Sequence, residues 1–326
     1  MASPTAPPTD LPGSGDTQAP GIIASATLLW LLAAGLVAVR FYVRTRIVKA
    51  FGAEDWILLV ALVFSLGHSI CFAELTAFGY GKHTWFITLE DFVNIGKTTF
   101  ALQICYMLSL AFTKISILVL YLRILTYHHA RWITWTILIL TVVYNIVGYA
   151  VQMTTCIPLQ KLWEPAVYGT CHSIALAWAF IGLHISTDFI LFALPIPIVT
   201  SITIPMREKI LLVVLFGLGF LACVVSLVRT AYMKIVFTVT VDPSWDSIPM
   251  SHWNCVEVNV AMVCACLMTV KPLISKLWPG LLDRPSSNEV DLESTKDSVI
   301  MASEASSTMR PQPSKTSDPR SVDIKV

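Results

Sequence analysis

Charged side chains inside long apolar stretches are the residues of this sequence that could do chemistry. They are Lys114, Asp188, Arg229 and Glu257. Each would cost at least ~2.5–3.5 kcal/mol at the centre of a membrane helix unless a partner or water compensates it. Their depths in these stretches favour two ion pairs, Lys114 with Asp188 and Arg229 with Glu257. Such pairs either form a polar core that binds a ligand or switches between two states, or they fix how the helices pack, because breaking a buried pair strongly destabilises a fold.

A histidine belongs to the same candidate set. His184 stands four residues before Asp188, so both lie on one face of a helix. A metal site would need three or four converging ligands. His68 lies near mid-depth, His172 and His252 lie at the mouths of helices, and no His-x-x-x-His spacing occurs. We therefore predict a hydrogen-bonded histidine–aspartate pair rather than a metal centre.

No catalytic group and no cofactor are predicted. Intramembrane zinc hydrolases with seven helices need a set of histidines that is missing from this sequence. Retinal needs a lysine in the bundle core, in the last helix of known retinal proteins. Lys271 lies instead at the end of the last apolar stretch beside Pro272, where snorkelling accounts for it. We therefore expect neither an enzyme nor a retinal protein.

Two of the eight cysteines stand out by position, because only cysteines outside the membrane oxidise in the secretory route. Cys156 and Cys171 share one predicted outer loop, with fourteen residues between them. A bridge would close a lid over the bundle and constrain the unfolded chain by about 3 kcal/mol. We predict this disulfide. The alternative is that one of the two pairs with Cys71, Cys105 or Cys255, in the outer halves of their helices.

The composition says what kind of element must position these residues. The chain has 326 residues, of which 55% are hydrophobic and 13% charged, and its mean hydropathy is +0.70. Soluble proteins are roughly 25% charged, since their surface must be solvated. The chain is therefore predicted to be an all-α membrane protein, which excludes a soluble enzyme, a disordered scaffold and a single-span receptor. The net charge of +1 gives no indication of a nucleic-acid partner.

Seven spanning helices are predicted between two polar tails, because about 260 apolar residues hold roughly seven spans of ~20 residues each. Residues 1–20 contain five prolines and no basic residue, and residues 283–326 are rich in Ser, Thr and Pro, so both tails are expected to be disordered around a bundle at 21–282. The spans are predicted at Gly21–Phe41, Trp56–Leu75, Asn94–Leu122, Trp132–Thr154, His172–Thr200, Lys209–Phe237 and His252–Ile274.

Basic residues concentrate in alternate connections of this bundle, which predicts its orientation. The first, third and fifth connections and the segment after the last helix carry them, so the N-terminus is expected outside and the C-terminus in the cytoplasm. Arg40 and Arg44, in the first inner loop, are expected to attract anionic lipid headgroups, with a site for a protein partner as the alternative. Glu54 and Asp55 are expected to cap the second helix.

Short motifs distributed over residues 29–282 form a combined pattern. They are Arg40-Phe-Tyr-Val-Arg44, Gly52-Ala-Glu54-Asp55-Trp56, Lys114-Ile-Ser116, Tyr121-Leu-Arg123, the loop from Cys156 to Cys171, Asp188 with Pro195-Ile-Pro197, Arg207-Glu-Lys209, Phe216-Gly-Leu-Gly219, Arg229, and Trp253 with Glu257 and Asn259. Together they resemble the fungal seven-helix membrane proteins known as the fungal rhodopsin domain, or satratoxin-cluster-like, family. Met268 stands where that family often has a proline. The resemblance implies a receptor-like or pathway-associated membrane protein, without implying light sensing.

The leading hypothesis is a receptor-like multi-pass protein that senses an extracellular or membrane-dissolved small molecule, tied to a secondary-metabolite pathway. The alternative is a transporter or accessory protein that handles a hydrophobic metabolite; an intramembrane hydrolase is disfavoured. The expected partners are the lipid bilayer, a small-molecule ligand and a cytoplasmic signalling partner, and no nucleic acid. The plasma membrane is the expected location, with an endomembrane as the alternative.

Overall fold

The computed structural model describes residues 16–47, 49–125, 128–164, 166–194, 206–239 and 242–267. Several sequence predictions fall outside these ranges. They concern most of the two tails (1–15 and 283–326), the Pro195-Ile-Pro197 segment, Met268, and Lys271 with Pro272.

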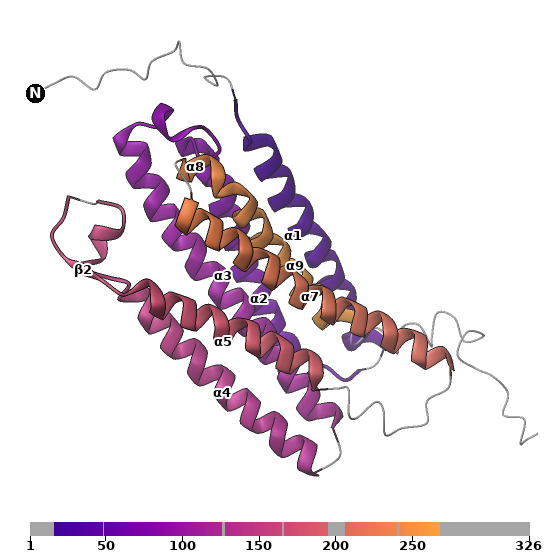
Figure 1. The fold of residues 1–326 in the computed structure, drawn as a ribbon. Coiled ribbons are helices and arrows are strands. Elements are labelled where there is room, and N and C mark those ends of the chain that lie inside the picture. Colours follow the sequence, from indigo (N-terminus) through magenta and orange to yellow (C-terminus); the bar gives the residue numbers. More distant parts are fainter. Residues whose placement is uncertain are drawn as a thin grey trace, which may run out of the picture. The chain divides into compact units, whose positions relative to one another are not determined.

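Long α-helices dominate the described chain (Figure 1). They are α1 (Ala19–Tyr42), α2 (Ala53–Glu74), α3 (Leu89–Ile124), α4 (His128–Met153), α5 (Ile174–Ala193), α7 (Met206–Val239) and α9 (Ile248–Leu267). Each predicted span coincides with one of these helices, with ends displaced by a few residues wherever the end is described. The short elements are η1 (Val43–Ile47), η2 (Leu75–Phe78), η3 (Thr84–Phe86), η4 (Leu159–Leu162), α8 (Pro243–Asp246), and the strands β1 (Cys156–Ile157) and β2 (Thr170–Cys171).

Within the described residues, six helices are long and apolar enough to cross a membrane. They are α1 with η1, α2 with η2, α3, α4, α5, and residues 217–236 of α7. The predicted multi-span helical membrane fold is therefore confirmed. The seventh predicted span corresponds to α9, which does not belong to this set, so its crossing and the orientation of the two termini stay predictions.

The core forms where α9 contacts its neighbours. This helix packs against α1, α2, α3 and α7, while α2 packs most extensively on α3, α4 packs on α3, and α5 packs on α7. Leu118, Val258, Met262 and Ala265 are fully buried in the resulting apolar cluster. Large apolar side chains on α4, such as Ile139, are exposed, as expected of a helix that faces lipid.

A disulfide-closed loop covers the start of α3. Cys156 and Cys171 form the predicted disulfide at the ends of β1 and β2, which pair antiparallel. The alternative pairings are wrong, because Cys71, Cys105 and Cys255 remain thiols. Trp163 in this loop lies against α3, where a Cβ atom on Gly96 would come within 2.6 Å of the Trp163 Cβ. A glycine at position 96 therefore lets the loop approach the helix closely.

A second connection at the same end joins the segment before α3 to the segment before α9. The His83 ring stacks between Trp85 and Trp245, with ring centroids 4.7 and 4.4 Å away. Asp242 accepts hydrogen bonds from His83 Nδ1 at 2.7 Å, from the Thr84 backbone N–H at 3.0 Å and from the Thr84 hydroxyl. Burial raises the pKa of the Asp242 carboxyl, but these hydrogen bonds outweigh it and hold the pKa below its ordinary value.

Candidate functional site

Side chains from five helices, α3, α4, α5, α7 and α9, meet in a polar cluster inside the bundle. Both predicted ion pairs are present in it. Lys114 Nζ lies 2.9 Å from Asp188 Oδ1, and Arg229 Nε lies 2.9 Å from Glu257 Oε2. We call this group the floor cluster, and it comprises Tyr106, Lys114, Tyr144, His184, Asp188, Ser226, Arg229 and Glu257.

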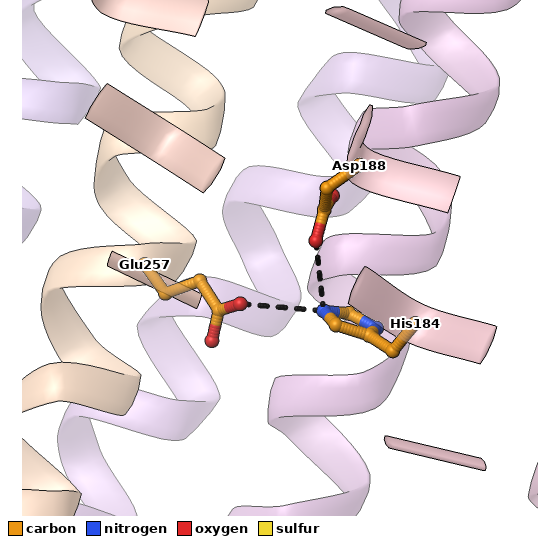
Figure 2. A group of neighbouring side chains, drawn as sticks. All are labelled: His184, Asp188 and Glu257. Atoms are coloured by element: carbon orange, nitrogen blue, oxygen red, sulfur yellow. Dashed lines mark hydrogen bonds and ion pairs between the residues drawn. The ribbon is translucent and has the colours of Figure 1, made fainter. Parts of the chain in front are cut away.

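His184 lies between Asp188 and Glu257, one carboxylate from each ion pair (Figure 2). Its Nε2 lies 3.5 Å from Asp188 Oδ2 and 3.3 Å from Glu257 Oε1. Its Nδ1 lies 3.2 Å from the Tyr144 hydroxyl and 3.5 Å from Lys114 Nζ. Nε2 thus faces two carboxylates, whereas Nδ1 faces two groups that can donate hydrogen bonds. His184 and Asp188 are therefore in contact, as predicted, but as an ion pair at 3.5 Å, and the hydrogen bond of His184 Nε2 goes to Glu257.

Neutral side chains complete the environment of Glu257. The Tyr106 hydroxyl donates a hydrogen bond to Glu257 Oε2 at 2.5 Å, and the Ser226 hydroxyl donates to Oε1 at 2.6 Å. The Arg229 guanidinium carbon lies 5.4 Å from the centroid of the Tyr106 ring, a cation–π distance. Sequence reasoning missed Tyr106, Tyr144 and Ser226, since an uncharged polar residue in a helix carries no signal comparable to a buried charge.

The ionic balance of the floor cluster bears on metal binding. Ligand atoms of His184, Asp188 and Glu257 lie within 4.8 Å of one another, a separation at which three side chains could hold a cation. Lys114 and Arg229 already neutralise the two carboxylates, however, so a divalent ion would add two uncompensated charges. This balance favours an ion-pair network, and the absence of a metal stays a prediction.

The other candidate histidines are not brought into this cluster. His68 is buried in α2, and its ring nitrogens have no hydrogen-bond partner among the described residues. His252 Nδ1 lies 2.9 Å from the Ser25 hydroxyl, and His172 Nε2 lies 3.2 Å from the Thr154 hydroxyl. Each of these histidines thus occupies a separate environment.

A cavity of about 680 Å³ adjoins the floor cluster. It is lined by residues of α3, α4, α5, α7 and α9 and of the disulfide-closed loop. Leu162 and His172 line it at the loop, while Tyr106, His184 and Arg229 line it at the cluster. Its volume falls in the range of small-molecule pockets, about 300–1,000 Å³. A molecule in the cavity would therefore contact three residues of the floor cluster, Tyr106, His184 and Arg229.

A second ionic group lies where α1, α2 and α3 meet. We call it the basic-end cluster, and it comprises Arg40, Arg44, Glu54, Asp55 and Arg123. Arg40 Nε lies 2.9 Å from Asp55 Oδ1, and Arg44 Nη1 lies 2.6 Å from Glu54 Oε1 and 2.9 Å from Asp55 Oδ2. Arg123 Nη1 lies 2.6 Å from Glu54 Oε1.

This arrangement corrects the prediction that Arg40 and Arg44 face lipid headgroups. The two residues are 2% and 8% exposed. One turn apart on one helical face, they both point at the first turn of α2, where Glu54 and Asp55 neutralise them more closely than headgroups would. The expected capping by Asp55 is confirmed, because its Oδ2 accepts a hydrogen bond from the Gly52 backbone N–H at 3.1 Å.

The basic-end cluster also reaches α3 and α9 through backbone oxygens. The Ser116 hydroxyl donates a hydrogen bond to the Glu54 carbonyl at 2.7 Å, and Arg40 Nη1 donates to the Ala265 carbonyl at 2.5 Å. Four helices, α1, α2, α3 and α9, are thus held at this point. Its residues come largely from the motifs that carry the sequence resemblance.

Comparison with known proteins identifies the pattern over most of the chain. The family model described as "Fungal rhodopsin domain" matches residues 39–276. The chain is 26% identical over 283 residues to "Polyenoic acids biosynthesis gene cluster protein Ba17b" of Metarhizium anisopliae, covering 81% of this chain and 76% of that protein. No solved structure matches.

Two further relatives carry descriptions of a different kind. "Receptor GIN3" of Arthrobotrys oligospora is 24% identical over 265 residues, covering 78% of this chain and 62% of the relative. "SAT4 family membrane protein" of Emericella nidulans is 25% identical over 230 residues, covering 69% of this chain and 55% of the relative. The chain thus spans less than two thirds of the length of these two proteins.

Proposed function

Because the chain belongs to the fungal rhodopsin domain family of membrane proteins, we propose that it is a receptor-like protein that binds a small lipophilic molecule in the cavity beside the floor cluster. One observation carries this proposal. The cavity ends on an ion-pair network to which five helices contribute, so a bound molecule would contact groups that hold the bundle together.

The network offers a physical route from binding to response. A ligand shifts a conformational equilibrium only by the difference between its affinities for the two states. Arg229 and His184 line the cavity and also bind Glu257 of α9, so a ligand that contacts them changes how strongly α5 and α7 hold α9. The resulting helix shift would be reported to a cytoplasmic signalling partner through the connections predicted to be inside.

The names of relatives support a link to secondary metabolism. One relative is named as a receptor, and another as a biosynthesis gene cluster protein. We therefore propose that the ligand is a metabolite and that the receptor acts in the plasma membrane, with an endomembrane as the alternative. The proposal assigns the chain no enzymatic activity, no retinal and no resident metal.

A cavity-filling variant tests the proposal. Ala177 lines the cavity, and Ala175, on the same helix, is exposed without lining it. Cells that express the chain are exposed to an organic extract of the culture medium of the fungus that makes it. A second-messenger response that is lost in Ala177→Phe and kept in Ala175→Phe is expected. Flux of a compound from this extract into proteoliposomes without a cellular response would replace the receptor by the transporter alternative.

A further inference from the structure

The cavity wall contains basic side chains but no carboxylate among the described residues. Arg229, His184 and His172 line it, and no aspartate or glutamate among the described residues does. Asp188 and Glu257, the carboxylates of the floor cluster, lie outside the lining. Arg229 is the arginine in this wall, and no described carboxylate lies in the lining beside it. An end group that accepts hydrogen bonds from a guanidinium, such as a carboxylate, therefore suits this wall.

Arg229 retains hydrogen-bond donors for such an end. A guanidinium carries five N–H donors in a planar fork. Nε of Arg229 lies 2.9 Å from Glu257 Oε2 as an ion pair without an aligned hydrogen bond, and Nη1 and Nη2 make no hydrogen bond to any residue that the structure describes. Two terminal nitrogens of one guanidinium are the group that a carboxylate binds in a bidentate manner.

The remainder of the wall is predominantly apolar. Phe100, Met107, Phe180 and Met233 line the cavity between the floor cluster and the disulfide-closed loop. Burial of an apolar chain against such side chains contributes most of the binding free energy of a lipophilic ligand, while a few polar groups fix its orientation. A molecule that fits both parts of the cavity has an apolar body and one acidic end.

We propose that the cavity binds an amphipathic carboxylic acid, with its carboxylate on the terminal nitrogens of Arg229 and its apolar chain extending towards Leu162 in the disulfide-closed loop. This inference rests on the proposed function, which requires a lipophilic ligand but not an acid. Binding places a negative charge next to the Arg229–Glu257 pair, so the guanidinium is shared between the ligand and Glu257. The acid would thereby weaken the link between α7 and α9.

A binding measurement with a fluorescent polyene acid tests this proposal. The full chain is placed in phosphatidylcholine nanodiscs and titrated with cis-parinaric acid or with its neutral methyl ester. Because charge-assisted bidentate hydrogen bonds are strong, the acid is expected to bind about tenfold or more tightly than the ester. Arg229→Lys keeps the charge but loses the fork, so it is expected to reduce the preference for the acid.

Two further variants separate recognition from folding. Arg229→Gln combined with Glu257→Gln removes both charges of the pair, so no uncompensated charge is left buried, and the acid and ester are expected to bind equally. Arg123→Gln removes an arginine that also pairs with a glutamate but lies outside the cavity lining, so it is expected to keep the preference. Thermal unfolding of each purified variant shows that the fold is retained.

The outcomes distinguish this inference from the proposed function. Equal binding of acid and ester to the unmodified chain would overturn the proposal of an acidic ligand, and the proposed function would remain as a receptor for a neutral lipophilic molecule. Absence of binding by either probe, with the response to culture extract still lost in Ala177→Phe, also overturns the acid alone. Absence of both the binding and the response overturns the two proposals together.

Extraction of the purified protein identifies the source of the acid. A fatty acid released from membrane lipids would co-purify from any host, whereas a metabolite acid would co-purify from the producing fungus. Mass spectrometry distinguishes these two acids, and either one supports the proposal. Neutral lipid alone in the extract of a protein whose cavity is occupied would contradict it.

Discussion

The floor cluster and the basic-end cluster use the same chemistry, carboxylates neutralised by cations between helices, but they differ in what lies beside them. The floor cluster adjoins a cavity of about 680 Å³. The basic-end cluster lies at the start of α2, where Phe41, Phe51 and Trp56 pack edge to face, with ring centroids 4.7 to 6.2 Å apart. A buried charge by itself therefore does not indicate a binding site, and the adjoining cavity is what distinguishes the floor cluster.

The two clusters also differ in their proton chemistry. The floor cluster contains His184, Tyr106 and Tyr144, which can donate or accept hydrogen bonds in more than one way. The cations of the basic-end cluster are arginines, whose planar guanidinium groups bind carboxylates in a fixed geometry. The first arrangement has alternative hydrogen-bond partners within reach, whereas the second is suited to holding helices in one position.

The largest loss of stability is expected from Asp55→Ala, which tests whether the basic-end cluster is needed to hold the fold. The change leaves Arg40 without its carboxylate partner and removes one of the two partners of Arg44. Breaking a buried pair in this way destabilises a protein by about 3–5 kcal/mol. Thermal unfolding of the purified protein measures the loss, with the exposed Glu90→Ala as the control. An unchanged melting temperature would contradict a structural role for this cluster.

The second prediction concerns how much the disulfide of the loop at the covered end of the cavity stabilises the protein. Replacing Cys156 and Cys171 together by serine removes the bridge that closes the loop. Loop-closure entropy predicts a loss of about 3 kcal/mol of unfolding free energy. Chemical denaturation measures it, and Cys71→Ser, a change at a free thiol, is the control. Equal stability of the two proteins would show that the loop is held by its packing on α3 instead.

The third prediction compares Asp188→Asn in the floor cluster with Asp55→Asn in the basic-end cluster. The amide keeps the shape of the side chain but weakens the charge-assisted contact to Lys114, which is worth roughly 1.5–3 kcal/mol. We expect a protein that still reaches the membrane and responds differently to culture extract, whereas Asp55→Asn is expected to reduce the amount in the membrane. Failure of Asp188→Asn to reach the membrane would favour a purely structural floor cluster.

A smaller effect is expected from Arg123→Gln. The Arg123 side chain is 41% exposed, and its partner Glu54 keeps Arg44. Solvent-exposed ion pairs contribute up to ~1 kcal/mol, so the melting temperature should change little. A loss of stability as large as that of Asp55→Ala would mean that the exposed Arg123–Glu54 pair stabilises the protein as much as the buried pairs of Asp55 do.

The smallest effect at neutral pH is expected at Asp242, which belongs to neither cluster. Its pKa is lower in the folded than in the unfolded protein, so its contribution to stability is complete above the unfolded value of 3.8 and is lost as the pH falls towards the lower, folded value. Unfolding curves of Asp242→Asn and the unmodified chain should run parallel from neutral pH to about 5 and converge below that. Convergence at a higher pH would assign the effect to another group.

The two ion pairs of the floor cluster were predictable from the sequence because charges in apolar helices have few possible partners. Lys114 and Asp188 share one depth, and so do Arg229 and Glu257. The disulfide followed from two cysteines in one predicted outer loop. The helices themselves followed from apolar runs of spanning length.

The environment of these pairs was not predictable in the same way. Arg40 and Arg44 lie near a predicted membrane edge, where headgroups or carboxylates can both neutralise them, and the sequence does not give the rotation of α1 that decides between the two. Tyr106 and Ser226 carry no charge whose burial demands an explanation. The cavity arises from incomplete packing of five helices, a property of the assembled bundle rather than of any one segment.

Helix α3 contributes to both clusters as a single rod. It has 36 residues without interruption, a length of about 54 Å at 1.5 Å per residue. Lys114 binds Asp188 in the floor cluster, and Ser116, about 3 Å further along the axis, binds the Glu54 carbonyl. A rigid rod cannot slide or turn at one of these points while staying fixed at the other. The floor cluster and the basic-end cluster therefore share one uninterrupted helix, and a displacement of α3 at Lys114 would also displace Ser116 and its contact to Glu54.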